Sequence, residues 1–340
     1  MKHRFFALAL TLALVLSGCA RQAEPLSRTV YAMDTVMTLR VYGAEDSALD
    51  AAEQELLRLD ALLDRHDEKS AVSAFNAAPA DEPQALDGEV LSLLKKAEGI
   101  TSATDGAFDV TVAPLLDAWG FGADAYRVPT QDELEALLPL VGSCGLTLTD
   151  AAAAHGAGVQ VDLGGVAKGY AGSRVRDILV ECGVTSASVD LGGDVCLLGA
   201  KSDGSDWRVA VRDPQDSSGF LGLLTLRDCF VVTSGAYERG FEKNGVRYHH
   251  IIDPSTGYPA ESGLMSVSVV CADGAQADAL STAVFVLGAQ RALAIYNAAE
   301  ALGLAPFELL LVQQDGSVLL TAGLFDRFVP EEGVQYASFG

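Results

Sequence analysis

Apolar residues recur along this chain with helical spacing in several segments. Five of them follow one another at intervals of three and four: Leu49, Ala52, Leu56, Leu59 and Leu63. This spacing places them on one face of an amphipathic helix. Similar patterns predict further helices over residues 87–101, 130–139, 170–182, 276–287 and 291–302. Thr130 and Glu133 have the spacing of a capping box, which would begin the helix near residue 130.

Other segments are rich in β-branched residues or alternate between apolar and polar positions, which predicts strands. They cover residues 35–41, 187–191, 207–212, 229–233, 264–271 and 309–313. Asp315 and Gly316 form a tight-turn signal between two terminal strands. Strands and helices are mixed without regular βαβ alternation. The pattern therefore favours an α+β fold, with mixed sheets packed against helices, over a doubly wound sheet.

The first residues have the pattern of an export signal. Lys2 and Arg4 precede an apolar run over residues 5–16, whereas a bilayer-spanning helix needs about 20 apolar residues. The run ends in Leu-Ser-Gly-Cys, which resembles a bacterial lipobox and predicts cleavage before Cys19 and lipidation of its thiol. The alternative is an ordinary signal peptide with an incidental cysteine.

This leader divides the chain into three expected parts. They are a lipoprotein signal peptide over residues 1–18, a membrane tether over 19–28 and one folded domain over 29–330. The domain is expected outside the cytoplasm, attached to the bacterial membrane through the N-terminal lipid.

The composition is that of a folded protein with an acidic surface. Of the 340 residues, 49% are hydrophobic and 20% are charged, which excludes a disordered chain. Acidic residues outnumber Lys and Arg by 46 to 23, and a formal net charge of −23 argues against a nucleic acid partner. The five cysteines besides Cys19 show no CxxC spacing, so a zinc site is not supported. Cys196 and Cys271 have apolar neighbours, which favours buried thiols over disulfides.

Two glycine-rich segments follow short apolar strands. Residues 161–170 read VDLGGVAKGY and lead into a helix, where helix-start N–H groups and Lys168 would attract a phosphate. The segment matches neither a Walker loop nor GxGxxG, and a glycine turn with a surface lysine is the alternative. Residues 189–194 repeat the strand and Gly-Gly pattern, which a plain turn would also explain.

A third segment, residues 248–259, contains two adjacent histidines and a carboxylate. His249 and His250 would point to opposite faces of a strand, so only one can line a given site. A histidine with Asp253 nearby suits general-base chemistry. The alternative is that Asp253 caps the Pro-Ser-Thr-Gly turn and the histidines are simply packed.

A fourth segment places oxygen groups in an apolar helix. Asp278 and Thr282 are four residues apart and therefore share one helix face. A buried carboxylate needs a cation, and oxygen ligands of this kind suit Mg²⁺. The alternative is that Asp278 caps the start of the helix. A fifth segment joins residues 106–115 to the turn at 119–122, whose tryptophan would either stack on a planar ring or lie in the core.

These five segments occur together and in this order, and with them the chain closely resembles the ApbE family. The likeness runs from about Ala32 to Gly288. The family consists of bacterial extracytoplasmic, often lipid-anchored FAD:protein FMN transferases. The resemblance implies an α+β flavin transferase that converts FAD and a Ser or Thr hydroxyl of an acceptor flavoprotein into a protein-linked FMN phosphoester and AMP, with Mg²⁺ as cofactor.

The resemblance also implies roles for individual residues. FAD would contact Met33, His66, Trp119, Gly120, Phe121, Asp162, Lys168 and Ile252. The Mg²⁺ ligands would be Asp278, Thr282 and the backbone carbonyl of Gly165, with Ser281 as a further contributor. His250 would deprotonate the acceptor hydroxyl, and Asp253 would orient His250.

The chain departs from the family pattern at two positions. Asp34 stands where the family commonly has a glycine after the first methionine, and His66 stands where it usually has an aromatic residue. If His66 admits water to the diphosphate, hydrolysis of FAD to FMN and AMP would compete with transfer. A Mg²⁺-dependent FAD pyrophosphatase and a non-catalytic FAD-binding lipoprotein are therefore the alternatives. Residues 234–236 resemble an acceptor motif, but Tyr237 follows, so we assign them to the chain's own site.

Overall fold

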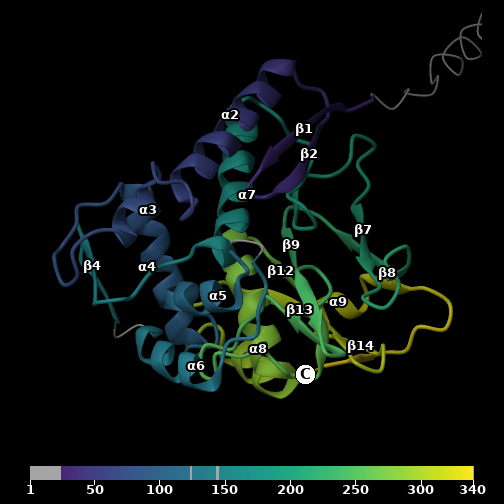
Figure 1. The fold of residues 1–340 in the computed structure, drawn as a ribbon. Coiled ribbons are helices and arrows are strands. Elements are labelled where there is room, and N and C mark those ends of the chain that lie inside the picture. Colours follow the sequence, from purple (N-terminus) through teal and green to yellow (C-terminus); the bar gives the residue numbers. More distant parts are fainter. Residues whose placement is uncertain (1–23, 123–124, 143–144, 340) are drawn as a thin grey trace, which may run out of the picture.

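A nine-stranded sheet runs through the centre of the computed structural model, which describes residues 24–122, 125–142 and 145–339 (Figure 1). In spatial order its strands are β1 (Leu26–Ala32), β2 (Thr35–Val41), β5 (Ala187–Asp190), β6 (Val195–Leu198), β9 (Phe230–Gly235), β12 (Leu264–Cys271), β13 (Phe307–Gln313), β14 (Val318–Leu320) and β16 (Tyr336–Ser338). All neighbours pair antiparallel except β14 and β16, which are parallel. The predicted α+β class is confirmed.

Strand β1 was not predicted from the sequence. Residues 26–28 were assigned to the membrane tether, but Leu26 is in register with Val41 and β1 pairs with β2 along its whole length. Val30 and Ala32 are buried, so this strand contributes to the core. The predicted end of the tether is therefore wrong, because residues 26–28 belong to the fold. The expected signal peptide and Cys19 lie outside the described residues.

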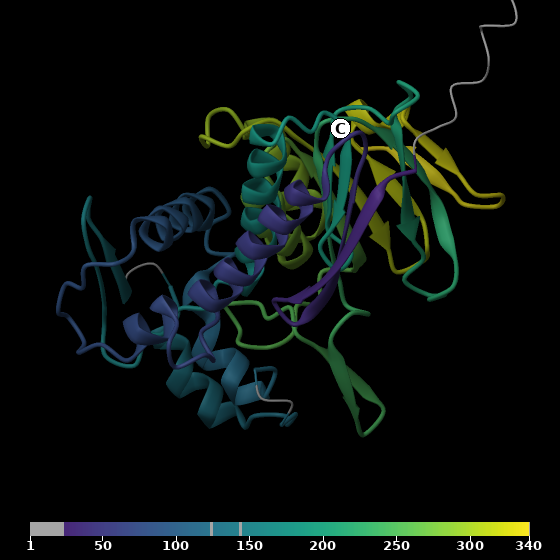
Figure 2. The same ribbon diagram turned by 90° about the horizontal axis from the view of Figure 1, so that it is seen from above.

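Three helices pack on one face of this sheet: α2 (Asp46–Leu63), α7 (Gly164–Glu181) and α8 (Gly274–Ala298). Figure 2 shows them between the sheet and a separate group of helices. The apolar stripe predicted for the first helix is buried in α2. Helix α8 is long and apolar enough to cross a membrane by length and composition, yet most of its first half is buried in the core. Gly288, with φ of 74°, breaks it where the sequence predicted two helices.

Two glycines let helices α7 and α8 cross in backbone contact. A Cβ atom on Gly169 would lie 2.0 Å from the carbonyl oxygen of Gly274, and one on Gly274 would lie 2.2 Å from the carbonyl oxygen of Gly169. No side chain fits at either position. The sequence predicted this helix only from Tyr170, whereas the glycine-rich segment itself forms its first turns. The crossing brings Asp278 against the start of α7, where it accepts a hydrogen bond from the Gly169 N–H at 2.9 Å.

A smaller sheet covers part of the opposite face of the main sheet. Its order is β15 (Phe328–Pro330), β8 (Phe220–Leu226) and β7 (Trp207–Arg212). The two sheets enclose an apolar cluster that includes Leu197, Trp207, Leu224 and Leu310. This arrangement makes β7 an edge strand.

The remaining elements complete the described part of the fold. They are α3 (Ala71–Asn76), α4 (Gly88–Ala103), α5 (Ala113–Trp119), α6 (Gln131–Leu137), α9 (Ala322–Phe325), the hairpins β3 (Leu146–Leu148) with β4 (Ala153–His155) and β10 (Gly240–Lys243) with β11 (Val246–His249), and short 3₁₀ turns at Val110–Val112 and Leu138–Leu140. The capping box predicted for Thr130 and Glu133 is present at the start of α6.

Candidate functional site

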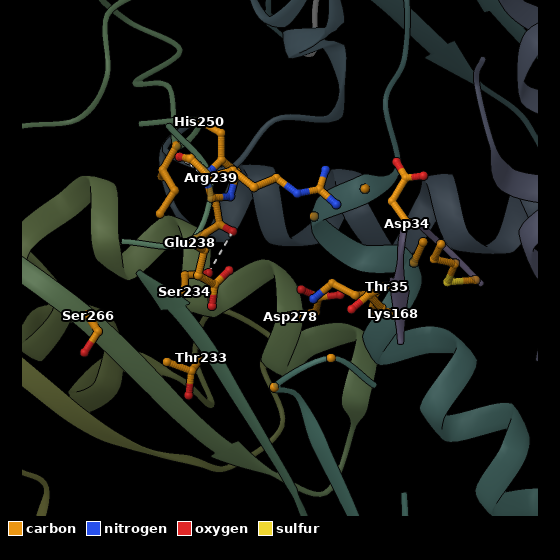
Figure 3. A pocket seen from close by; sticks show the side chains of 18 of the residues that line it. Asp34, Thr35, Lys168, Thr233, Ser234, Glu238, Arg239, His250, Ser266 and Asp278 are labelled. Carbon is orange, nitrogen blue, oxygen red and sulfur yellow. Dashed lines mark hydrogen bonds between the residues drawn. The ribbon is translucent and has the colours of Figure 1, made fainter. Parts of the chain in front are cut away.

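A cavity of about 1030 Å³ lies where the β1–β2 turn, the start of α7, the β5–β6 turn and the ends of β9 and β11 meet. We divide its lining by the elements that carry it. The helical wall comprises Met33, Asp60, Arg65, His66, Ala107, Phe108, Asp109, Phe121, Asp162 and Ile252. The sheet wall comprises Arg40, Ser188, Asp190, residues 207–212, Phe220, Thr233, Ser266 and Ser268. The central group comprises Gly165, Lys168, Ser234, Tyr237, Glu238, Arg239, His250, Asp278 and Thr282 (Figure 3).

The predicted metal ligands lie together in the central group. Asp278 is 4% exposed, and burial raises the pKa of its carboxyl to about 6 even though Lys168 opposes the shift. A Cβ on Gly165 would lie 3.9 Å from Thr282 Oγ1, so the backbone of residue 165 adjoins that hydroxyl. A carboxylate, a hydroxyl and a carbonyl form a hard oxygen set, which fits Mg²⁺. Among the described residues no cluster of three or more His, Cys, Asp or Glu side chains is placed to hold a metal.

The start of α8 excludes the alternative reading of Asp278 as a helix cap. That role belongs to Asp273, whose Oδ1 accepts the Gln276 N–H at 3.1 Å. Asp278 lies more than one turn inside the helix and faces the cavity. Its charge therefore serves the cavity and the adjoining start of α7.

Lys168 forms an ion pair with Asp194, whose side chain is almost completely buried. Burial works against the charge on Lys168, but Asp194 and Asp278 outweigh it and raise the pKa of the ammonium group. The sequence predicted a lysine that meets a phosphate. In the structure Lys168 does line the cavity, and it is already held there by a carboxylate from the β5–β6 turn.

The two adjacent histidines face different surroundings, as predicted. His249 is buried, with Nε2 3.1 Å from the carbonyl oxygen of Ala260 and its ring against Phe285. His250 lines the cavity, and its Nδ1 lies 3.1 Å from the carbonyl oxygen of Arg239. Because a carbonyl oxygen only accepts, Nδ1 carries the proton and Nε2 keeps its lone pair. Burial lowers the pKa of His250 to about 4, so the ring is a neutral base at pH 7.

Asp253 does not orient His250. Its Oδ1 accepts hydrogen bonds from the Ser255 N–H at 2.8 Å and the Ser255 hydroxyl at 2.7 Å, and it is not among the residues that line the cavity. The prediction that Asp253 is catalytic is therefore wrong, and the alternative reading of a turn cap is correct. The backbone of Arg239 performs the orienting role instead.

Of the FAD contacts predicted at residues 119–121, only Phe121 lines the cavity. Trp119 is fully buried, packs among Leu115, Leu134 and Ile252, and donates its Nε1–H to the carbonyl oxygen of Gly257 at 2.7 Å. Gly120 ends α5 in a left-handed conformation with φ of 81°. Neither residue lines the cavity, so their assignment as FAD contacts is corrected to core and turn.

Residues 107–109 line the cavity in their place, and the sequence analysis gave them no role. Asp109 Oδ1 accepts from both the N–H and the hydroxyl of Thr111, at 2.8 and 2.6 Å, while burial raises its pKa. The motif at residues 106–115 was the signal that could have identified these residues. The sequence analysis assigned a role only to the aromatic turn that follows the motif.

On the helical wall, ion pairs and backbone turns hold the predicted contacts in place. Arg65 contacts Asp162 and Asp117, each at 2.6 Å. Met33 donates its backbone N–H to Asp60 Oδ1 at 2.8 Å and has φ of 50°. Asp34 has φ of 57°, which aspartate tolerates better than most residues.

His66 lines the same wall next to Phe121 and packs against the backbone at Gly122, where a Cβ would lie 2.7 Å from its Cε1. The structure thus brings Met33, His66, Phe121, Asp162, Lys168 and Ile252 to one cavity together with Gly165, His250, Asp278 and Thr282.

The segment after β9 supplies the group that sequence reasoning described least. Ser234 Oγ lies 2.7 Å from Ser281 Oγ and 3.4 Å from Thr282 Oγ1. Burial and Asp194 raise the pKa of Glu238 to about 7. Ser234 and Glu238 both line the cavity, so the assignment of this segment to the chain's own site is confirmed. Figure 3 shows it beside His250, facing Lys168 and Asp278.

None of the cysteines in the described part of the chain lines the cavity. Cys182, Cys196, Cys229 and Cys271 are free thiols, and the prediction of buried thiols holds for all of them except the exposed Cys182. Burial raises the pKa of Cys196 and of Cys229 to about 12. Cys144 lies outside the described residues.

Comparison with known proteins agrees with this geometry. Residues 33–304 match the ApbE family. A relative named FAD:protein FMN transferase from Treponema pallidum is 35% identical over 91% of this chain and 90% of its own length, and one from Vibrio cholerae is 32% identical over 96% and 99%.

Solved structures give the same result for the fold. The ApbE protein of Thermotoga maritima superposes with a TM-score of 0.80 at 35% identity, over 87% of this chain and 96% of that one. The flavin transferase ApbE from Vibrio cholerae does so with a TM-score of 0.80 at 30% identity, over 90% and 100%. The chain therefore belongs to the ApbE family of flavin-transferring enzymes.

Proposed function

We propose that this protein is a Mg²⁺-dependent FAD:protein FMN transferase. It moves FMN from FAD to a Ser or Thr hydroxyl of an acceptor flavoprotein and releases AMP. The observation that carries the proposal is the convergence of Asp278, Thr282 and the neutral base His250 on one cavity large enough for a dinucleotide. The names of the relatives supply the substrate.

FAD would occupy the helical wall and reach the central group with its diphosphate. Phe108 and Phe121 offer flat apolar surfaces for the flavin ring. Lys168 and the N–H groups at the start of α7 would face the diphosphate, since a helix N-terminus attracts anions. The Lys168–Asp194 pair holds the ammonium group in position before the substrate arrives.

Asp278, Thr282 and the carbonyl oxygen of Gly165 would hold Mg²⁺ beside the diphosphate. When bound, the ion supplies charge neutralisation as the phosphoanhydride bond breaks. The donor set fits this role because it presents one negative charge and neutral oxygens, which leaves positions for phosphate oxygens and water.

His250 acts as the general base of the reaction. Its Nε2 accepts the proton of the acceptor hydroxyl, and the hydroxyl oxygen bonds to the phosphorus of the FMN half. The bond from that phosphorus to the bridging oxygen breaks, and the bridging oxygen leaves with AMP. The Arg239 carbonyl fixes the ring so that Nε2 faces the cavity.

The test is intact-mass spectrometry of an acceptor flavoprotein domain incubated with FAD, Mg²⁺ and the purified full-length chain. A mass gain equal to an FMN phosphoester, abolished by EDTA, supports the transferase. Unmodified acceptor together with free FMN and AMP would instead establish a pyrophosphatase, and attention would move to His66. Intact FAD under every condition would leave only a flavin-binding lipoprotein.

We further propose that the enzyme works outside the cytoplasm, lipid-anchored through Cys19. The support is the leader sequence, whose apolar run ends at that cysteine. Cys19→Ser should move the protein from the membrane fraction to the soluble fraction on cell fractionation. If the variant stays with the membrane, the anchor is not the Cys19 lipid.

A further inference from the structure

Strand β7 has one free edge. In the small sheet it follows β8, which in turn lies beside β15. The Thr225 N–H donates to the carbonyl oxygen of Arg327 at 2.9 Å, and the carbonyl oxygen of Leu221 accepts the Glu331 N–H at 3.0 Å. Odd-numbered residues of β8 therefore direct their backbone groups toward the β15 side, and even-numbered residues direct theirs toward β7.

The register carries this alternation across to β7. Arg208 is opposite Thr225 and Ala210 is opposite Leu223, so both are at non-hydrogen-bonded positions of the β7–β8 ladder. The backbone N–H and carbonyl groups of Arg208 and Ala210 consequently point away from β8. They form an open edge that a further strand could pair with.

That open edge borders the cavity. All six residues from 207 to 212 line it, although their side chains alternate between the two faces of the strand. Trp207 and Val211 are buried toward the main sheet, whereas Arg208, Ala210 and Arg212 are exposed. Residues of both faces reach one cavity only if the strand meets it edge-on. Figure 1 shows β7 between β8 and the part of the main sheet that carries β1 and β2.

The sheet wall carries three arginines that form no ion pair, although the charge of Arg212 acts on Glu238 of the central group and Asp190 lies on the same wall. Arg40, Arg208 and Arg212 all line it, and no ion pair joins any of them to an acidic residue in the described part of the chain. Unpaired arginines beside an open strand edge are complementary to an extended segment with acidic side chains.

One end of strand β7 lies close to the segment that holds His250. The Arg212 guanidinium lies 6.0 Å from the ring centre of Tyr237, and Tyr237 precedes Glu238 and Arg239, whose carbonyl holds His250. At its other end, Trp207 contacts the ring of Tyr42 just after β2. Six residues of strand extend about 20 Å, so a segment paired along β7 would have one end beside His250.

We propose that the acceptor protein binds by adding an extended, acidic segment to the free edge of β7, which delivers its Ser or Thr hydroxyl to His250. This inference rests on the proposed transferase function and names how its protein substrate is recognised. The backbone pairing supplies affinity for any extended sequence, and the arginines select acidic flanks. FAD enters from the helical wall and the acceptor from the sheet wall.

The first experiment compares two substitutions at one position. Ala210→Pro removes the free N–H that an added strand needs, and proline is tolerated on sheet edges where that N–H is not used by the fold. Ala210→Val keeps the N–H and is the matched control. For Ala210→Pro we expect about a tenfold or larger rise in KM for a purified acceptor flavoprotein domain. The Kd for FAD should stay within about twofold, and Ala210→Val should raise the KM for the acceptor less than Ala210→Pro does.

The second experiment tests the charges. Arg208→Gln and Arg212→Gln should each raise KM for the acceptor by roughly fivefold and weaken its dependence on salt. Arg327→Gln, on the opposite side of the same small sheet, is the control and should leave KM unchanged. Thermal melting of each variant checks that the fold is retained.

Two results would overturn the proposal. If Ala210→Pro transfers FMN with the wild-type KM for the acceptor, the edge is not used. If it raises the Kd for FAD and leaves that KM unchanged, the sheet wall holds the adenosine half of FAD. Failure of the proposed transferase function gives a different result from failure of this inference. In that case the wild-type protein would convert FAD without modifying any acceptor, and the inference about β7 would fall with it.

Discussion

The two walls of the cavity treat charge in opposite ways. On the helical wall and at the centre, Arg65 contacts Asp117 and Asp162, and Lys168 is paired with Asp194. On the sheet wall, Arg40 and Arg208 line the cavity without such partners in the described chain. Paired charges hold side chains in place before a ligand arrives, which suits a small substrate whose shape does not vary. Arginines without an ion pair are free to bind the carboxylates of a protein partner.

The largest expected effect is at the centre, between the walls. Asp278→Ala removes the only carboxylate of the proposed metal site, and we expect the rate of FMN transfer to fall by about 10³-fold. The fold should survive, because small residues already surround this part of α8. The measurement is transfer rate against Mg²⁺ concentration. Asp273→Asn, at the cap of the same helix and outside the cavity lining, is the comparison variant, and equal losses in both would argue against a specific role for Asp278.

The next prediction compares the loss of stability on removing a paired cation with the loss on removing an unpaired one. Lys168→Met leaves Asp194 buried without its partner, and breaking such a pair costs about 3 kcal/mol of unfolding free energy. Arg208→Gln should cost less than about 0.5 kcal/mol, as is usual for exposed residues. Chemical denaturation of both variants measures the difference. Similar losses in both would mean that the sheet wall is as tightly built as the centre.

A third prediction concerns pH and His250. Its pKa of about 4 lies below the ordinary value of about 6.5, so the folded chain binds fewer protons here than the unfolded chain does between these values. The stability that this provides is complete above pH 6.5 and is lost as the pH falls to about 4. Between pH 7 and 4 wild type should therefore lose more stability than His250→Gln.

Imidazole NMR titration, assigned with the same variant, measures the pKa of His250 directly. A pKa near 6.5 would contradict the assignment of half-buried His250 as a neutral base. The general-base role has a separate test. His250→Ala should slow FMN transfer by about 10²-fold or more while FAD binding is retained.

Local sequence patterns predicted most of the elements that carry the site. The stripe of α2, the capping box of α6 and strands such as β7 and β12 each follow from spacing within one segment. Strand β1 escaped prediction because its place depends on pairing with β2 and not on its own pattern. The glycine-rich start of α7 was not predicted either, because glycine has a low helix propensity. Here glycine is needed at residue 169, where α7 and α8 cross in close contact.

The site was predictable where a residue's role follows from its neighbours in the chain. Asp278 and Thr282 share a helix face in sequence and in structure. The role of Asp253 was not predictable, because a turn cap and an oriented base require the same local pattern, and only the position of the Arg239 carbonyl separates them. Trp119 illustrates the same limit, since an aromatic residue beside a site motif has the same sequence whether it faces the ligand or the core.

The smallest expected effect tests that corrected assignment. Trp119→Phe keeps most of the buried ring but loses the hydrogen bond from Nε1 to the Gly257 carbonyl, which leaves a buried acceptor unpaired. We expect a loss of about 1–2 kcal/mol of unfolding free energy and no change in the Kd for FAD. Phe121→Leu, two residues later on the cavity wall, should show the reverse, with weaker FAD binding and nearly full stability. If Trp119→Phe weakens FAD binding more than Phe121→Leu does, the indole contacts the flavin and the helical wall is wider than its lining indicates.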